Sequence, residues 1–274
     1  MSDVTDRDGA GLRLRRFLRD NPLVPLLVLL VVLVGALEIM RPGIVNERWI
    51  ANTVKFAIPL AMLAACQTMT MLTGGIDLSA GVVATVAAFV MATQVPIVGE
   101  WWAVPVALIP ALIVGAANGI GIAFARVHPL IMTLGTGLIA TGCLQVYQRT
   151  VIASGSVVPD WLTWVGTGRT WGMPNALVVF VPLALLLLWG LKRTGFGRLL
   201  YAIGENEQAA RLSGVRSWQV LMALYMLSAL VAGTTGLVYL GLIRAPSLSL
   251  VVPLMLPSVA AAVLGGPSVF GGRG

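Results

Sequence analysis

The sequence is poor in charged residues, since Asp, Glu, Lys and Arg together make up 11% of its 274 residues. Soluble domains carry roughly 25% charged residues, so this chain lacks the polar surface that would cover a water-soluble globule. It also contains only two cysteines, with no CxxC pair, and a single histidine, His128. A disulfide framework and a His/Cys metal site are therefore both disfavoured, and we expect no bound metal.

Lysine is scarcer still, because Lys55 and Lys192 are the only two in the chain and neither follows a glycine. A phosphate-binding loop of the GxxxxGK[ST] type needs that lysine, so the chain has no such site of its own. HExxH, GxSxG and paired-carboxylate motifs are also missing, and one histidine leaves little general-base capacity. We therefore expect no enzyme activity, no catalytic residue and no cofactor on this chain.

Long apolar runs dominate what is present, since 58% of the residues are hydrophobic and the mean hydropathy is +0.91. A helix needs about 20 apolar residues to cross the hydrocarbon core of a bilayer. The sequence predicts an all-α, polytopic transmembrane protein with about eight spans. The predicted spans are residues 23–40, 54–73, 76–95, 102–125, 129–148, 174–191, 219–243 and 251–266.

The basic residues indicate the orientation of these spans. With the amino terminus inside, the inner segments hold twelve basic residues and the outer segments six, as the positive-inside rule requires. Residues 1–22 are thus predicted to be a basic cytoplasmic segment, followed by a transmembrane domain over 23–274. The net charge of +7 is explained by orientation, and we expect the bilayer rather than nucleic acid as its partner.

The longest predicted inner loop, residues 192–218, contains signals for a short helix. Asn206 can cap its start, Glu207 would lie in its first turn, and Gly214 would end it. Such a helix is too polar to insert into a membrane. Docking of a soluble partner and a simple interfacial turn are both compatible with this pattern.

A second feature is the stretch Thr73-Gly74-Gly75-Ile76-Asp77-Leu78-Ser79. Its glycines allow a break between two helices, and Asp77 or Ser79 can cap the helix that follows. Broken helices also occur at the solute sites of transporters, so contact between Asp77 and a polar solute is the alternative interpretation. Thr73, Gly74, Gly75, Asp77, Ser79, Asn118 and Thr133 are the candidates for the interrupted helix or a translocation path.

Small residues recur at four-residue spacing, as in Gly115-xxx-Gly119 and Ala232-xxx-Gly236. Such pairs let helix backbones approach closely within a membrane. The spacing predicts packing within the chain, with a seam between two copies as the alternative.

Four ordered segments resemble those of the membrane permeases of ribose-type (simple sugar) ABC importers. They are residues 71–81, Asn118-Gly119 with 128–136, 194–214 and 264–274. The resemblance implies a pore in the cell (inner or plasma) membrane, made with a second permease copy or paralogue. It also implies an ABC ATPase subunit that uses ATP and Mg²⁺, and an extracytoplasmic solute-binding protein. Members have about ten spans, so the chain is expected to lack the last two.

The same resemblance implies that the ATPase docks on the loop around 204–215, here called the coupling segment. The residues implied in coupling are Gly204, Glu205, Asn206, Glu207, Ala209, Ala210, Arg211, Leu212 and Gly214. The alternative function is a secondary carrier or channel that acts without an ATPase. Asp77 is the only acidic residue placed well below the membrane surface, however, and a proton relay needs more than one such group.

Overall fold

The computed structural model describes residues 23–151, 155–266 and 271–272. Its first six elements are the helices α2 (Leu23–Met40), α3 (Glu47–Met71), α4 (Ala80–Val98), α5 (Glu100–Ala123), α6 (Pro129–Val151) and α7 (Asp160–Thr167). A two-stranded antiparallel hairpin, β1 (Arg169–Thr170) and β2 (Met173–Pro174), follows. The rest are α8 (Leu177–Arg193), α9 (Gly195–Leu212), α10 (Ser217–Ile243), the 3-10 turn η2 (Val252–Leu254) and α11 (Met255–Leu264).

The helical membrane architecture predicted from hydropathy is confirmed. Six helices in the described residues, α2 to α6 and α10, are long and apolar enough to cross a bilayer. A seventh span results if α8 and α9, which meet at a bend of 67°, are taken together, and Val252–Leu264 is a shorter apolar helix. Each predicted span thus falls on an apolar helix, while the total of eight stays a prediction.

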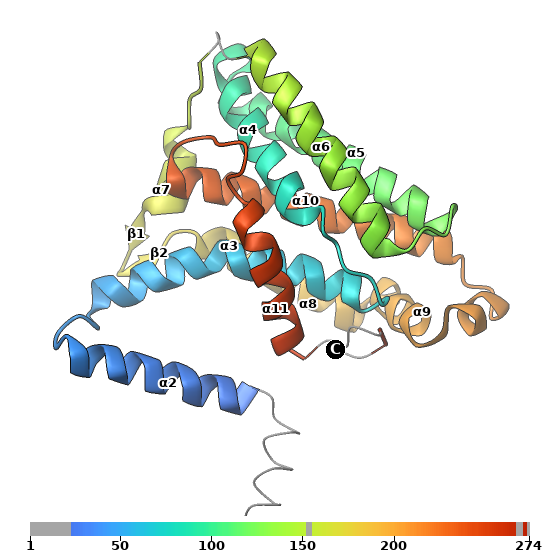
Figure 1. Ribbon diagram of the computed structural model, residues 1–274, viewed down its shortest axis with the longest axis horizontal. Coiled ribbons are helices and arrows are strands. Elements are labelled where there is room, and N and C mark those ends of the chain that lie inside the picture. The colour runs from blue at the N-terminus through green and yellow to red at the C-terminus, as the bar shows by residue number, and fades with distance from the viewer. Residues whose placement is uncertain (1–22, 152–154, 267–270, 273–274) are drawn as a thin grey trace, which may run out of the picture.

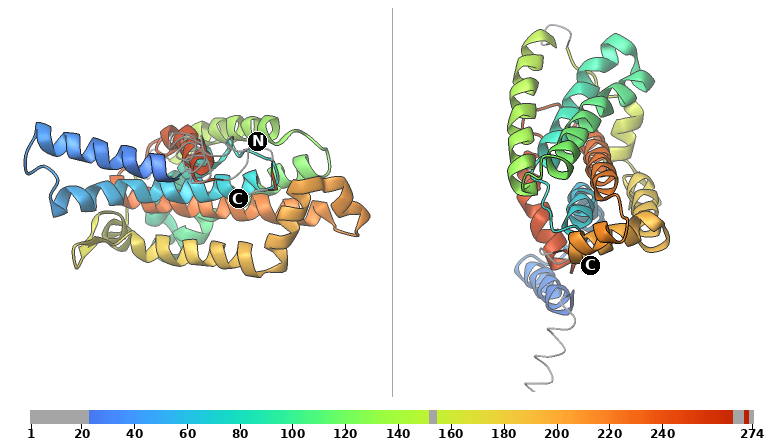
Figure 2. Two further views of the ribbon diagram at one scale, coloured as in Figure 1. Left: turned by 90° about the horizontal axis from the view of Figure 1, so that it is seen from below. Right: turned by 90° about the vertical axis from the view of Figure 1, so that its right-hand side faces the viewer.

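Helix α10 forms the centre of the bundle. It packs against α5, α4, α3 and α7, and Figure 1 shows it passing behind α4 and α11 through the middle of the molecule. Helix α2 stands apart from this body and has no buried residue, so its apolar surface is available to lipid. Figure 2 shows α3, α10 and α8 running alongside one another, with α9 turning away at one end.

Small residues make the close helix contacts within this chain. A Cβ atom built on Gly115 would lie 2.7 Å from the Ala229 Cβ on α10, and one on Gly236 would lie 1.9 Å from the Ala84 carbonyl oxygen on α4. Neither position has room for a side chain. The small-residue pattern therefore serves packing between α4, α5 and α10, as the spacing predicted.

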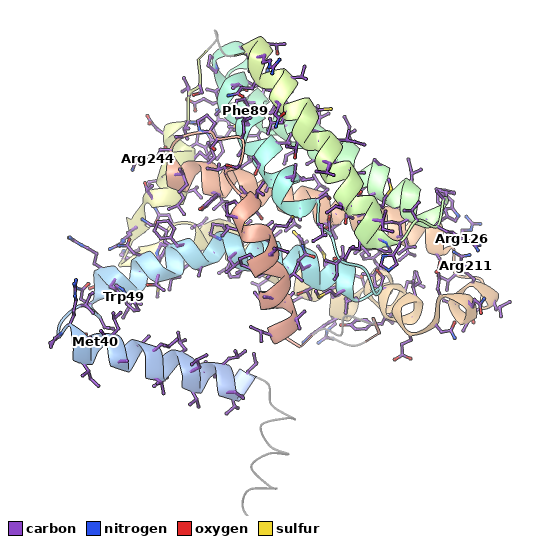
Figure 3. All side chains as sticks on the ribbon, viewed as in Figure 1. Met40, Trp49, Phe89, Arg126, Arg211 and Arg244 are labelled. Carbon is purple, nitrogen blue, oxygen red and sulfur yellow. The ribbon has the colours of Figure 1, made fainter. Side chains whose placement is uncertain are left out.

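The residues predicted for the inner and the outer side of the membrane lie at opposite ends of the bundle. Arg126 and Arg211 lie close together at one end of the molecule, whereas Arg244 and Trp49 lie at the other (Figure 3). The coupling segment belongs to the first end, while α7 and the hairpin belong to the second (Figure 1). This separation agrees with the predicted alternation of inner and outer loops; which end faces the cytoplasm stays a prediction.

Candidate functional site: an interrupted helix joined to a surface helix

The predicted break at Gly74-Gly75 separates α3 from α4. The Gly74 amide donates to the Met71 carbonyl, and the Gly75 amide donates to the Thr70 carbonyl, which closes the last turn of α3. Gly74 has a φ of +74°, a conformation that residues with a Cβ adopt only at a cost. The glycine therefore ends α3 and lets the chain run without helical structure until α4 begins.

Asp77 lies within this break and is buried, with 1% of its surface exposed. Its Oδ1 accepts hydrogen bonds from the Ser79 amide at 2.9 Å and from the Ser79 hydroxyl at 2.6 Å. Its Oδ2 accepts from the hydroxyl of Ser228, on α10, at 3.0 Å. The carboxylate thus lies at the amino end of α4, where the helix dipole favours a negative charge, while the Ser79 side chain makes no capping bond to α4.

Side chains from α3 and α6 pair with the backbone groups of the break that have no helical hydrogen bond. Gln67 donates from Nε2 to the Asp77 carbonyl at 2.7 Å and accepts from the Asp77 amide at 3.1 Å. The Thr133 hydroxyl accepts from the Leu78 amide at 3.0 Å and donates to the Ile76 carbonyl at 3.2 Å. A non-helical segment is tolerated at membrane depth only when its polar groups are paired in this way.

Asn118 extends these bonds across the bundle. Its Nδ2 donates to the Ser79 hydroxyl at 2.9 Å, and its Oδ1 accepts from the Thr136 hydroxyl at 2.6 Å. The resulting interrupted-helix network joins α3, α4, α5, α6 and α10. Its members are Gln67, Asp77, Ser79, Asn118, Thr133, Thr136 and Ser228.

The structure brings the candidate path residues together around this break. Asp77, Ser79 and Asn118 are linked by hydrogen bonds, and Thr133 bonds the backbone on either side of Asp77. Thr73 and Gly74 line an adjoining cavity. Gln67, Thr136 and Ser228 were not among the candidates, although a polar side chain within an apolar span was the available signal. Among the residues that the structure describes, no cluster of three or more His, Cys, Asp or Glu side chains could hold a metal ion.

The coupling segment forms the second half of α9. Asn206 interrupts that helix with a φ of −160° and a ψ of 101°. Its Oδ1 accepts from the Ala209 amide at 3.0 Å, the geometry of a helix N-cap. At the other end, Gly214 has a φ of +86°, and the Val215 amide donates back to the Ala210 carbonyl. The start and stop that the sequence predicts are both present.

The two alanines of the coupling segment lie in different surroundings. Ala210 is buried within the core, whereas Ala209 is exposed. Leu212 exposes 90% of its surface, which is unusual for leucine at a polar end of the molecule. Glu207 and Arg211 form an ion pair one turn apart on the same helix. Ala209 and Leu212 therefore present a small apolar patch, here called the coupling surface, on a helix held by its caps.

Three glycine-containing segments meet where the coupling segment approaches the break. The Gly272 amide donates to the Leu72 carbonyl at 3.0 Å. A Cβ atom on Gly204 would lie 1.8 Å from that same carbonyl oxygen and 2.6 Å from the Gly272 nitrogen. The backbones of α9 and of the interrupted helix are thus in direct contact, in what we call the glycine junction (Gly204, Leu72 and Gly272).

An apolar bundle built around an interrupted helix, with a capped surface helix touching it, is an arrangement typical of membrane transporters. The chain belongs to the family described as the branched-chain amino acid transport system, permease component, whose model matches residues 49–272. This is a family of transporter permeases rather than of catalytic enzymes, and the chain is a multi-pass protein of the cell membrane.

Curated relatives agree with the resemblance seen in the motifs. The chain is 31% identical to the ribose import permease protein RbsC of Escherichia coli (strain K12), over 90% of this chain and 78% of that protein. It is 34% identical to the galactofuranose transporter permease protein YtfT of the same strain, over 79% and 64%. The fructose import permease protein FrcC of Rhizobium meliloti is 30% identical, over 96% and 75%. No solved structure matches the chain.

Proposed function

We propose that this chain is the transmembrane subunit of an ABC importer and forms the translocation path for a sugar-type solute. The relatives named for ribose, galactofuranose and fructose import support the solute class. A separate ATPase subunit would hydrolyse ATP with Mg²⁺, because the sequence has no phosphate-binding loop. A solute-binding protein on the outer side and a second permease copy or paralogue would complete the importer.

The coupling surface is the observation that carries this proposal. Its two exposed apolar side chains, Ala209 and Leu212, lie on a helix that is capped at both ends. A rigid, partly apolar projection suits insertion into a cleft of another protein, because little conformational entropy is lost on binding. At the glycine junction, movement of this helix would act directly on the interrupted helix.

A cavity of about 610 Å³ lies between the coupling segment and the break. Thr73, His128 and Gln208 line it together with Tyr225, whose buried hydroxyl has no hydrogen-bond partner among the described residues. Hydroxyl, imidazole and amide groups suit a polyhydroxylated solute. We place the inner end of the translocation path here, with the interrupted-helix network as its support.

Docking is tested by changing the coupling surface. Ala209→Glu and Leu212→Asp are each expected to lower the amount of co-purified ATPase subunit at least about tenfold, because a charge would be buried in an apolar contact. Ala202→Glu is the matched control, since Ala202 is exposed on the first half of α9 and lies outside the coupling segment. The measurement is the ratio of the two subunits after affinity purification of the co-expressed complex.

Wild-type amounts of ATPase with both coupling-surface variants would refute the docking proposal. Solute movement by the reconstituted chain alone, driven by an ion gradient without ATP, would favour a secondary carrier instead. Ala210→Glu is not used, because Ala210 is buried and its substitution would disturb folding.

A further inference from the structure

A second, smaller cavity of about 380 Å³ lies at the same end of the molecule and collects positive charge. Arg126, from the connection between α5 and α6, Arg211, from the coupling segment, and Arg216, just before α10, all line it. Figure 3 shows Arg126 and Arg211 side by side. Arg211 is paired with Glu207, but Arg126 and Arg216 have no ion pair within the described part of the chain.

Uncompensated like charges repel one another, so such a cluster is stabilised by an anion bound between its members. A guanidinium group donates two parallel hydrogen bonds to a phosphate, which makes arginine the preferred side chain for phosphate recognition. Three arginines from three separate segments therefore define a site for a phosphate group.

An unpartnered hydroxyl supports the same conclusion independently. Ser217 also lines the cavity and is 3% exposed, yet its Oγ has no hydrogen-bond partner among the described residues. A buried hydroxyl without a partner costs free energy. This hydroxyl is enclosed, so its side chain would turn toward the cavity for a phosphate oxygen to accept its hydrogen bond and remove that cost.

The aromatic pair beside the arginines indicates the source of the phosphate. Phe124 and Trp218 line the cavity, and their ring centroids are 5.2 Å apart. Their exposed fractions are 56% and 42%, respectively. Exposed tryptophan next to an apolar span is typical of the depth at which lipid headgroups lie. A free phosphate would make no favourable contact with this apolar rim, whereas the glycerol and first acyl carbons of a phospholipid would pack against it.

We propose that this basic cavity binds the phosphate headgroup of an anionic phospholipid. Arg126 and Arg216 hold the phosphate, Ser217 donates to one of its oxygens, and Phe124 and Trp218 contact the lipid backbone. Because Arg211 belongs to the coupling segment, the bound lipid also stabilises the base of the coupling surface. Arg126 and Arg211 also line the larger cavity described above, but the proposal needs only that the chain is embedded in a membrane, and its test measures lipid binding without solute or ATPase.

The experiment uses the full chain purified in a neutral detergent. The measured quantity is its melting temperature with and without added lipid. Phosphatidylglycerol is expected to raise the melting temperature of the wild type, and phosphatidylcholine with the same acyl chains is not. The double variant Arg126→Gln/Arg216→Gln should need at least about ten times more phosphatidylglycerol for the same rise in melting temperature, since each interfacial arginine contributes attraction to an anionic lipid. Arg193→Gln is the matched control, because this exposed arginine precedes α9 and does not line the cavity.

Trp218→Ala separates the two sources of phosphate. It should weaken the effect of phosphatidylglycerol, while inorganic phosphate should have little effect on any variant. Equal stabilisation by both lipids, or an undiminished effect of phosphatidylglycerol on the double-arginine variant, would overturn the proposal. Stabilisation by inorganic phosphate equal to that by the lipid would overturn the assignment to a phospholipid.

Discussion

Replacing Asp77 with alanine is expected to destabilise the folded chain by at least about 3 kcal/mol. The change removes the acceptor for three donors, namely the Ser79 amide, the Ser79 hydroxyl and the Ser228 hydroxyl. Each buried donor left without a partner costs about 1–3 kcal/mol. The measurement is the midpoint of unfolding as a denaturing detergent is titrated into the purified protein.

The matched substitutions test the cause. Asp77→Asn keeps an amide oxygen toward Ser79 and offers its NH₂ to the Ser228 hydroxyl, so it is expected to cost only about 1 kcal/mol. Glu100→Ala removes an exposed carboxylate at the start of α5 and should leave the midpoint unchanged. Wild-type stability of Asp77→Ala together with lost uptake would instead favour direct contact between Asp77 and the solute.

The sequence predicted the features of this site that depend on local chemistry. The glycine break before α4, the Asn206 cap and the Gly214 stop each follow from preferences of a few neighbouring residues. Hydropathy located the apolar helices because it, too, depends only on residues that are close together in the chain. The bond from Ser228 to Asp77 is different, because Ser228 is 151 positions away in the chain. A single serine within an apolar span shows neither which side it faces nor what it will contact.

The inner loop shows a second limit of local reasoning. Residues 192–218 were predicted as a loop with a short helix after Asn206. That helix is present, but the structure adds a first helical stretch, from Gly195 to the Asn206 kink, that the sequence did not predict. Two glycines near its start lower helix propensity. Gly197 is nevertheless required, since a Cβ atom there would lie 2.0 Å from the Leu191 carbonyl oxygen. Close packing of α9 on α8 therefore outweighs the local preference.

Gly204→Ala is expected to separate ATPase docking from solute import. The added methyl group would overlap the Leu72 carbonyl oxygen and approach the Gly272 nitrogen, and neither backbone atom can move without opening the junction. The coupling surface lies beyond the Asn206 kink and is unchanged. The ATPase subunit should therefore co-purify normally, while cellular uptake of the solute that the importer carries falls at least about tenfold, because overpacking costs about 1–3 kcal/mol.

Gly195→Ala is the control within the same helix, where the nearest atom to an added Cβ is Arg198 Nη2 at 4.0 Å. It should retain both docking and uptake. Normal uptake by Gly204→Ala would show that import does not depend on movement passed through the glycine junction. Loss of both docking and uptake would show that the two halves of α9 do not move independently. Retained docking with lost uptake is the result expected if movement passes from the ATPase to the interrupted helix through Gly204. The direct backbone contact between α9 and Leu72 supplies such a path, because packed backbones transmit a displacement that flexible side chains would absorb.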